Sequence, residues 1–346
     1  MNPLRLGPNQ PIRFYRGGER IAAFRGVEPE NDSVPEDWVG STTVLFGEAS
    51  LGLTRLPDGE LLRDAVAADP VAWLGAAHAE RFGGDTALLV KLLDAGQRLP
   101  VHCHPSDDFA RRHLDCPRGK TEAWVITEVY GDDPVVHLGF RHDVDAEVLA
   151  GWVERQETEP MLDALHRVPV SAGDAVLVPA GIPHAIGAGI FLVELQQPTD
   201  LSVLLDWQGF DVDGLRDGHL GLGFEVALGC VDRSGWSADR LGALRCSRDD
   251  GRPVSAGVTL ALPAEADSFF RAERVRPGLE ARLGAAFAIL VVIMGKGVLA
   301  TDNGGTLDVR GGETVLIPYS AGSAVLRGDV EAVRCMPPAT GVTERV

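Results

Sequence analysis

The 346-residue sequence predicts a mainly β protein built from two β-barrel domains with helical insertions. From residue 87 onward, short runs rich in Val, Leu and Ile alternate with Gly, Pro and Asp, a rhythm typical of sandwiches and barrels. A unit that starts with Gly and an acidic residue and ends with an apolar run and Pro occurs at 173–179 and again at 312–318. The repetition indicates two copies of one barrel, and two unrelated strands that each end in proline are the alternative.

Four regions are expected along the chain. Residues 1–84 mix turn signals with helical pattern and should pack on the first barrel, which spans 85–207. Residues 208–253 read as a helical and loop connection, and 254–346 as the second barrel. The predicted strands of the first barrel are 87–95, 123–130, 135–140, 175–178, 190–195 and 201–205.

Two helical stretches are predicted outside these strands. Residues 60–68 have apolar side chains at helical spacing, and Pro70 interrupts the pattern. A helical insertion at about 143–166 places Val148 and Val153 on one apolar face, with Asp143 as a candidate N-cap.

Charge and cysteine content exclude several classes of protein. Fifty acidic against 32 basic residues give a formal charge of −18, which disfavours binding to nucleic acid or to anionic membranes. Five scattered cysteines without a Cys-x-x-Cys pair argue against a disulfide framework and a cysteine zinc knuckle. The sequence has neither the apolar core of a signal peptide nor an apolar run long enough to span a bilayer. We therefore expect a soluble, cytoplasmic protein, and the sequence does not indicate its oligomeric state.

A His-x-His pair ends the motif Gly-Gln-Arg-Leu-Pro-Val-His-Cys-His at residues 96–104. In a strand, residues i and i+2 face the same side, so His102 and His104 project together while Cys103 points away. Two imidazoles on one face form half of a site for a divalent ion. By itself the pair is a weak signal.

A second spaced pattern, in the expected order, strengthens this interpretation. Residues 173–184 read Gly, five residues, Pro-Ala-Gly, two residues and His184. Together the two motifs resemble those of the cupin superfamily, in which the histidines converge inside a small jelly-roll barrel. The resemblance implies two cupin domains, and the second is expected to be metal-free because no histidine follows Tyr319-Ser-Ala.

Further stretches resemble the type I mannose-6-phosphate isomerases. The likeness covers roughly residues 11–207 and returns more loosely over 287–337. The stretches that carry it are Gly17-Gly18, Leu89-Val-Lys-Leu-Leu-Asp-Ala, His104-Pro-Ser-Asp-Asp-Phe-Ala, Gly119-Lys-Thr-Glu-Ala-Trp, Pro179-Ala-Gly-Ile-Pro-His-Ala-Ile-Gly and Glu194-Leu-Gln-Gln-Pro-Thr-Asp.

This resemblance implies one metal site. The usual cupin carboxylate would lie at Asp107 or Asp108, but the isomerase likeness favours Glu122 instead. The family normally has glutamine at one of the four ligand positions, where this chain has histidine. Zinc is the metal that the family implies, and manganese, iron, cobalt or nickel could bind the same donors. The implied ligands are His102, His104, Glu122 and His184.

The resemblance also implies three catalytic residues. Lys120 lies two residues before Glu122 and should face the same way, with a role in sugar binding or proton transfer. A lysine beside a divalent cation has its charged form disfavoured, which suits an acid or base. Glu194 and Asp200 are candidate proton carriers by resemblance alone. Ordinary solvated surface charge is the alternative interpretation for all three.

One departure from the family pattern bears on the substrate. After Gln-Gln-x-x-Asp the family usually has an aromatic residue and an arginine before Asp-Trp, whereas this chain reads Ser202-Val-Leu-Leu-Asp-Trp. The segment is one residue shorter and lacks the arginine. Arg111, Arg112 and Arg118 could replace its charge, or they are simply solvated.

The function we expect is a metal-dependent aldose–ketose isomerase acting through an enediol. Mannose 6-phosphate to fructose 6-phosphate is the first candidate reaction, with a sugar or sugar phosphate as the only expected partner. Isomerisation of another sugar, including an unphosphorylated one, is an alternative because the arginine is missing. A non-catalytic sugar-binding or regulatory cupin is the other alternative.

Overall fold

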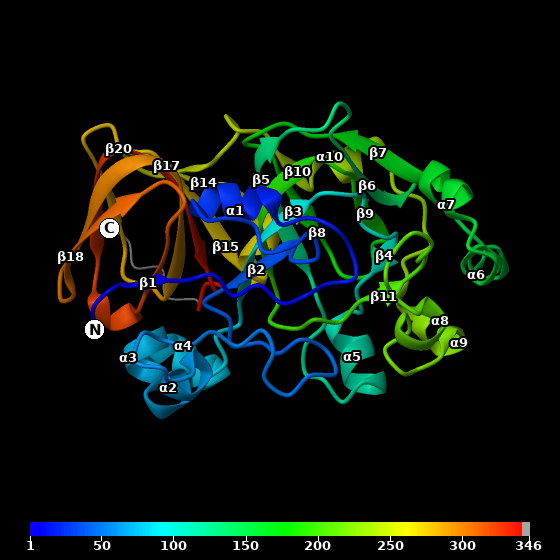
Figure 1. Ribbon diagram of the computed structural model, residues 1–346, viewed down its shortest axis with the longest axis horizontal. Helices are drawn as coiled ribbons and strands as arrows, with labels where there is room; N and C mark the ends of the chain where they lie inside the picture. The colour runs from blue at the N-terminus through cyan, green and yellow to red at the C-terminus, as the bar shows by residue number, and fades with distance from the viewer. Residues whose placement is uncertain (341–346) are drawn as a thin grey trace.

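The computed structural model describes residues 1–340 and confirms the predicted mainly β architecture. Its strands form three sheets, and all strand pairs within them are antiparallel. In Figure 1 the sheet near the C-terminus lies at the left in orange and red, and the strands of the first region lie at the centre and right in cyan and green.

The first region contains two sheets that together surround the candidate site. The six-stranded sheet has the order β12 (Arg245–Cys246), β8 (Ala175–Val178), β5 (Glu122–Val129), β10 (Ile190–Gln196), β3 (Leu89–Ala95) and β2 (Glu36–Val39). The five-stranded sheet has the order β11 (Val203–Leu204), β4 (His102–Cys103), β9 (His184–Ile186), β6 (Val135–Phe140) and β7 (Leu165–Pro169). All six strands predicted for this region are present, β6 and β8 with the predicted bounds.

The third sheet has nine strands and forms the second barrel. Its main order is β1 (Leu4–Leu6), β19 (Thr314–Ile317), β17 (Ala288–Thr301), β20 (Ala324–Met336), β15 (Arg271–Val275), β14 (Val258–Leu260) and β13 (Pro253–Ser255). Off this path, β16 (Glu280–Leu283) pairs with β20 and β18 (Gly305–Arg310) pairs with β17.

The helices lie mostly at the edges of the sheets (Figure 1). None of the helices within residues 1–340 is both long and apolar enough to cross a lipid bilayer. Their bounds are α1 (Glu19–Arg25), α2 (Leu62–Ala68), α3 (Pro70–Leu74), α4 (Ala76–Phe82), α5 (Asp107–His113), α6 (Ala146–Arg155), α7 (Thr158–Ala164), α8 (Gly214–Asp217), α9 (Phe224–Ala227) and α10 (Ala238–Gly242), with 3₁₀ turns η1 (Leu228–Cys230), η2 (Ala264–Ser268) and η3 (Tyr319–Ala321).

The predicted helical insertion is present as α6 and α7, but its cap and its buried face differ from the prediction. Asp145 precedes the first turn, and the carboxylate of Asp143 instead accepts a hydrogen bond from the backbone N–H of Gly235. Val153 is buried as predicted, whereas Val148 faces solvent and is 43% exposed. The apolar face of α6 is therefore narrower than the spacing of its apolar residues suggested.

The repeated unit takes the same local structure in both copies. Gly173 and Gly312 have φ angles of +93° and +91°, and each precedes a buried four-residue strand, β8 and β19, that ends before a proline. At Gly312 a Cβ would lie 2.0 Å from the carbonyl oxygen of Phe24. Both the left-handed backbone and this close approach require glycine.

Two short strands join sheets that lie far from them in the sequence. β1, at the N-terminus, pairs with β19 of the second barrel, and β12, in the predicted connection, pairs with β8 of the first. Residues 36–39 also extend the first barrel's sheet as β2. These pairings run across the predicted domain limits, which stay a prediction.

A buried carboxylate holds the turn that leads into β4. Asp206 is fully buried and accepts hydrogen bonds from the backbone N–H of Val101 and from Oγ1 of Thr158. Its Oδ2 also lies 2.8 Å from Nη2 of Arg98. One side chain thus ties the residue before β4 to the start of α7.

We expect Asp206→Ala to lower the free energy of unfolding by about 3 kcal/mol, because the substitution leaves buried donors without an acceptor. Chemical denaturation of the full chain measures this loss. Asp217→Ala, which removes an exposed partner of Arg216, is the control and should leave the denaturation midpoint unchanged. Equal losses in the two variants would contradict the role of Asp206.

Candidate metal centre and substrate pocket

Three histidines meet because β4 lies antiparallel to β9. His102 is directly opposite His184 in that pair, and His104 is the residue that immediately follows β4. The ring centroids of His102 and His184 lie 4.1 Å apart, and His104 lies 4.9 Å from each of them. One ring nitrogen of each lies within 4.8 Å of the other two, the single such cluster found among residues 1–340.

Backbone carbonyls orient all three rings. A carbonyl can only accept a hydrogen bond, so each Nδ1 carries a proton, and in a neutral ring the lone pair is then on Nε2. Nε2 of His184 is buried and has no hydrogen-bond partner within the described residues. This is the arrangement that metal-binding imidazoles require. The Nδ1-to-oxygen distance is 2.8 Å in every case: His102 to Pro100, His104 to Leu201 and His184 to Ile182.

Glu122, the first residue of β5, places a carboxylate beside these nitrogens. Its Oε2 lies 3.0 Å from Nε2 of His104, and its Oε1 lies 3.4 Å from Nε2 of His184. The indole Nε1 of Trp124 donates a hydrogen bond of 3.0 Å to Oε1 and fixes the carboxylate. Three imidazoles and one oriented carboxylate fit a divalent metal ion.

Burial sets the protonation state of this cluster. It lowers the pKa of His102 well below its usual range, and it lowers that of His104 to about 3, with the nearby Lys120 charge adding to the effect. Burial alone would raise the pKa of Glu122, but Lys120 and His104 outweigh it and hold that pKa well below its usual range. Neutral imidazoles and an ionised carboxylate are the forms that bind metals.

Lys120 contacts the same cluster, as predicted from its spacing to Glu122. Its Nζ lies 2.8 Å from Oε2 of Glu122 and 3.0 Å from Nε2 of His104. The loop that carries it runs against the chain after His104, where its backbone N–H donates to the carbonyl of Pro105 at 3.0 Å. A Cβ on Gly119 would lie 2.1 Å from that carbonyl oxygen, so only glycine permits this approach.

Glu194 and Asp200 also line the pocket. Glu194 is buried on β10, 3.5 Å from Nζ of Lys91 and 3.9 Å from Nζ of Lys120. Burial and the charge of Glu122 raise the pKa of Glu194 to about 7. Asp200 accepts a hydrogen bond from Arg13 and another from the backbone N–H of Phe46. Both carboxylates are thus largely shielded from solvent and paired, and neither is an ordinary solvated surface charge.

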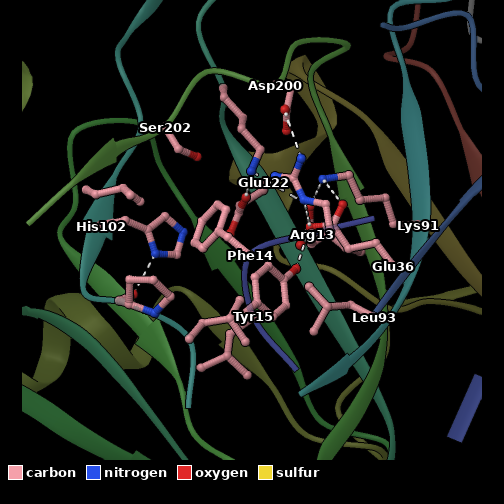
Figure 2. Close-up of a pocket in the computed structure, with 16 residues that line it drawn as sticks. Arg13, Phe14, Tyr15, Glu36, Lys91, Leu93, His102, Glu122, Asp200 and Ser202 are labelled. Carbon is pink, nitrogen blue, oxygen red and sulfur yellow. Dashed lines mark hydrogen bonds and ion pairs between the residues drawn. The ribbon is translucent and has the colours of Figure 1, made fainter. Parts of the chain in front are cut away.

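The N-terminal region contributes a charge network that the sequence did not indicate (Figure 2). Oε1 of Glu36 lies 3.2 Å from Nε of Arg13, and Oε2 lies 3.3 Å from Nζ of Lys91. Tyr15 and Trp38 donate hydrogen bonds to the same carboxylate. A lysine inside the apolar strand β3 was the one available signal, since charged residues such as Arg13 and Glu36 are usually solvated.

The three arginines proposed to replace the family arginine lie elsewhere. Arg111 pairs with Asp107 and Asp108 on its own helix, and Arg112 is exposed. Arg118 pairs with Asp85 at 2.8 Å. None of the three lines the pocket, so the idea that they supply its positive charge is wrong.

Similarity in sequence to known proteins is partial. No protein-family model matches the chain. It is 39% identical over 156 residues to the mannose-6-phosphate isomerase of Bacillus subtilis (strain 168), across 43% of this chain and 48% of that protein. It is 35% identical over 198 residues to the mannose-6-phosphate isomerase of Streptococcus mutans, across 53% and 54%. The chain thus spans about half the length of these curated relatives.

Similarity in fold extends much further. The crystal structure of the Bacillus subtilis mannose 6-phosphate isomerase matches with a TM-score of 0.71 at 20% identity, over 97% of this chain and 99% of that one. A variant of phosphomannose isomerase from Salmonella typhimurium matches with a TM-score of 0.72 at 18% identity, over 98% and 100%. This chain is therefore similar to mannose-6-phosphate isomerases in sequence over about half of its length, and in fold over nearly all of it.

Proposed function

We propose that the protein is a metal-dependent aldose–ketose isomerase acting on a sugar phosphate, with mannose 6-phosphate and fructose 6-phosphate as its first candidate substrates. The observation that carries the proposal is the convergence of three imidazoles and the Glu122 carboxylate beside Lys120 at one site. The names of the sequence relatives support the choice of sugar.

The proposed ligands fit the metal that the resemblance implies. His102, His104, His184 and Glu122 would hold one divalent ion, zinc by family likeness, with manganese, iron, cobalt or nickel as chemical alternatives. Such an ion supplies Lewis-acid polarisation of the carbonyl and hydroxyl oxygens at the two carbons that exchange a proton. Trp124 and the three backbone carbonyls keep the ligand atoms in place.

The proton transfer falls to residues of the same pocket. Isomerisation removes a proton from one carbon and returns one to its neighbour, so it needs groups that can accept and donate near neutral pH. Glu194, with its raised pKa, is our candidate base. Lys120 and Asp200 are our candidates for binding the sugar oxygens and moving the hydroxyl protons.

An unphosphorylated sugar is the second candidate substrate. The lysines and the arginine that line the pocket are Lys120, Lys91 and Arg13, and all three already pair with carboxylates. A phosphate dianion gains most from cations without such partners. Alternating cations and carboxylates also suit sugar hydroxyls, which both donate and accept hydrogen bonds.

Metal content tests the proposed ligands directly. We expect one equivalent of divalent metal in the protein reloaded after chelation, and a loss of at least about tenfold in metal affinity in His184→Ala, because a ligand is removed. Elemental analysis and a competition titration with a chromophoric chelator measure this. His113→Ala, on the exposed side of α5, is the matched control. Equal affinity in His184→Ala and the wild type would exclude His184 as a ligand.

Turnover tests the proposed reaction. We expect metal-reloaded protein to convert mannose 6-phosphate to fructose 6-phosphate in a coupled assay, and Glu122→Gln to abolish that conversion because it removes the anionic ligand. Absence of turnover with zinc, manganese, iron, cobalt and nickel would exclude this substrate. Turnover of mannose alone would select the second candidate, and sugar binding without any turnover would select a regulatory cupin.

A pH profile tests Glu194. A carboxyl with a pKa near 7 is protonated below that pH and can accept a proton only above it. We therefore expect kcat/KM to rise with pH through about 7, and Glu194→Gln to remove that limb and lower kcat by about 10²- to 10⁴-fold. The control is Glu128→Gln, because Glu128 is half-exposed on β5. An unchanged profile in Glu194→Gln would assign the base to another residue.

A further inference from the structure

We propose that Arg13 is the ligand-binding arginine of this pocket, donating hydrogen bonds to acceptor oxygens of the bound sugar or sugar phosphate. The inference rests on the proposed function, which names the pocket's ligand. It assigns to the N-terminal segment a role that neither the motifs nor their spacing indicated.

The position of Arg13 is suited to this role. It lies between β1 and α1, and its backbone N–H donates to the carbonyl of Ser33 at 2.8 Å, so the segment is anchored beside the pocket. Its side chain lines the pocket and is 12% exposed. Figure 2 shows the guanidinium beside Asp200 and Glu36, across the pocket from His102, with Glu122 between them. It therefore faces the part of a ligand that extends away from the metal centre.

Two carboxylates hold the guanidinium without using all of its donors. Nη1 donates to Asp200 at 3.4 Å, and Nε lies 3.2 Å from Glu36 as an ion pair. Nε is nevertheless buried without a hydrogen-bond partner among the described residues. A guanidinium has five N–H donors in one plane, and here its plane is fixed while donors remain for a ligand.

No other arginine of the described chain can take this role. The segment from Leu201 to Asp206 has none, and Arg13 is the single arginine among the residues that line the pocket. Arg13 thus occupies the pocket from a different segment than the one in which the family arginine lies.

The test compares Arg13→Gln, Arg13→Lys and the matched control Arg118→Gln in the full, metal-loaded chain. KM and kcat are measured for mannose 6-phosphate and for mannose, and calorimetric titration gives Kd for the same two sugars and for inorganic phosphate. We expect Arg13→Gln to raise KM and Kd for the preferred sugar about 10- to 100-fold, as for loss of a charge-assisted hydrogen bond, with a smaller change in kcat. Arg13→Lys should lose less, and Arg118→Gln should change both by less than about twofold.

Each outcome decides the matter. A loss confined to mannose 6-phosphate and inorganic phosphate supports a contact to the phosphate group, and an equal loss for mannose supports a contact to sugar hydroxyls. Unchanged KM and Kd in Arg13→Gln would overturn the inference. So would equal losses in the Gln and Lys variants accompanied by the same drop in Tm, which indicate a structural role.

Failure of the proposed function is distinguishable from failure of the inference. If no metal supports turnover, the isomerase proposal fails, and the calorimetric Kd values still report whether Arg13 binds the sugar. If the wild-type protein binds neither sugar, the inference fails as well.

Discussion

The structure of the site depends on one constraint: a charge buried inside an apolar barrel must be paired. Glu36 is the clearest example. Its carboxylate accepts hydrogen bonds from Tyr15 and Trp38 and forms ion pairs with Arg13 and Lys91. Burial alone would raise its pKa, yet the charges of Arg13 and Lys91 hold that pKa well below the usual range. Each group needs the others, since removing one partner would leave an uncompensated charge in the interior.

A second constraint acts on the candidate metal centre. β4 has only two residues, so its position is fixed by neighbours on both sides, β9 and β11, and by the Asp206 carboxylate at its start. Each of the three histidine rings is then oriented by a hydrogen bond to a main-chain carbonyl. Side chains held by the main chain in this way are what a binding site for a specific geometry needs.

Much of this arrangement follows from local rules of sequence. The spacing of two residues predicted that His102 would lie beside His104 and Lys120 on the side of Glu122, and both pairs do lie together, although His104 and Lys120 lie just outside β4 and β5. The strand predicted at 201–205 is only two residues long, because the carbonyl of Leu201 turns to His104 instead of joining the ladder.

What sequence reasoning could not reach is the pairing between distant segments. Arg13 and Asp200 are 187 residues apart, and no periodicity connects them. Arg111 and Arg118 are positively charged and follow the first histidine motif in sequence. In the folded chain they form ion pairs with Asp108 and Asp85 instead of lining the pocket. A polar side chain in a loop has many possible partners, and only the folded chain selects among them.

The pairing of β1 with β19 bears on the order in which the molecule is assembled. Leu4–Leu6 bond to residues 314–316, so this strand gains its partner only after residue 316 has been synthesised. Only six residues separate Leu6 from Arg13. The completed pocket of the first barrel therefore follows synthesis of the second, and contacts of such long sequence separation form late and slowly. The candidate metal ligands, of which His184 is the last, would therefore all be synthesised well before β1 gains its partner.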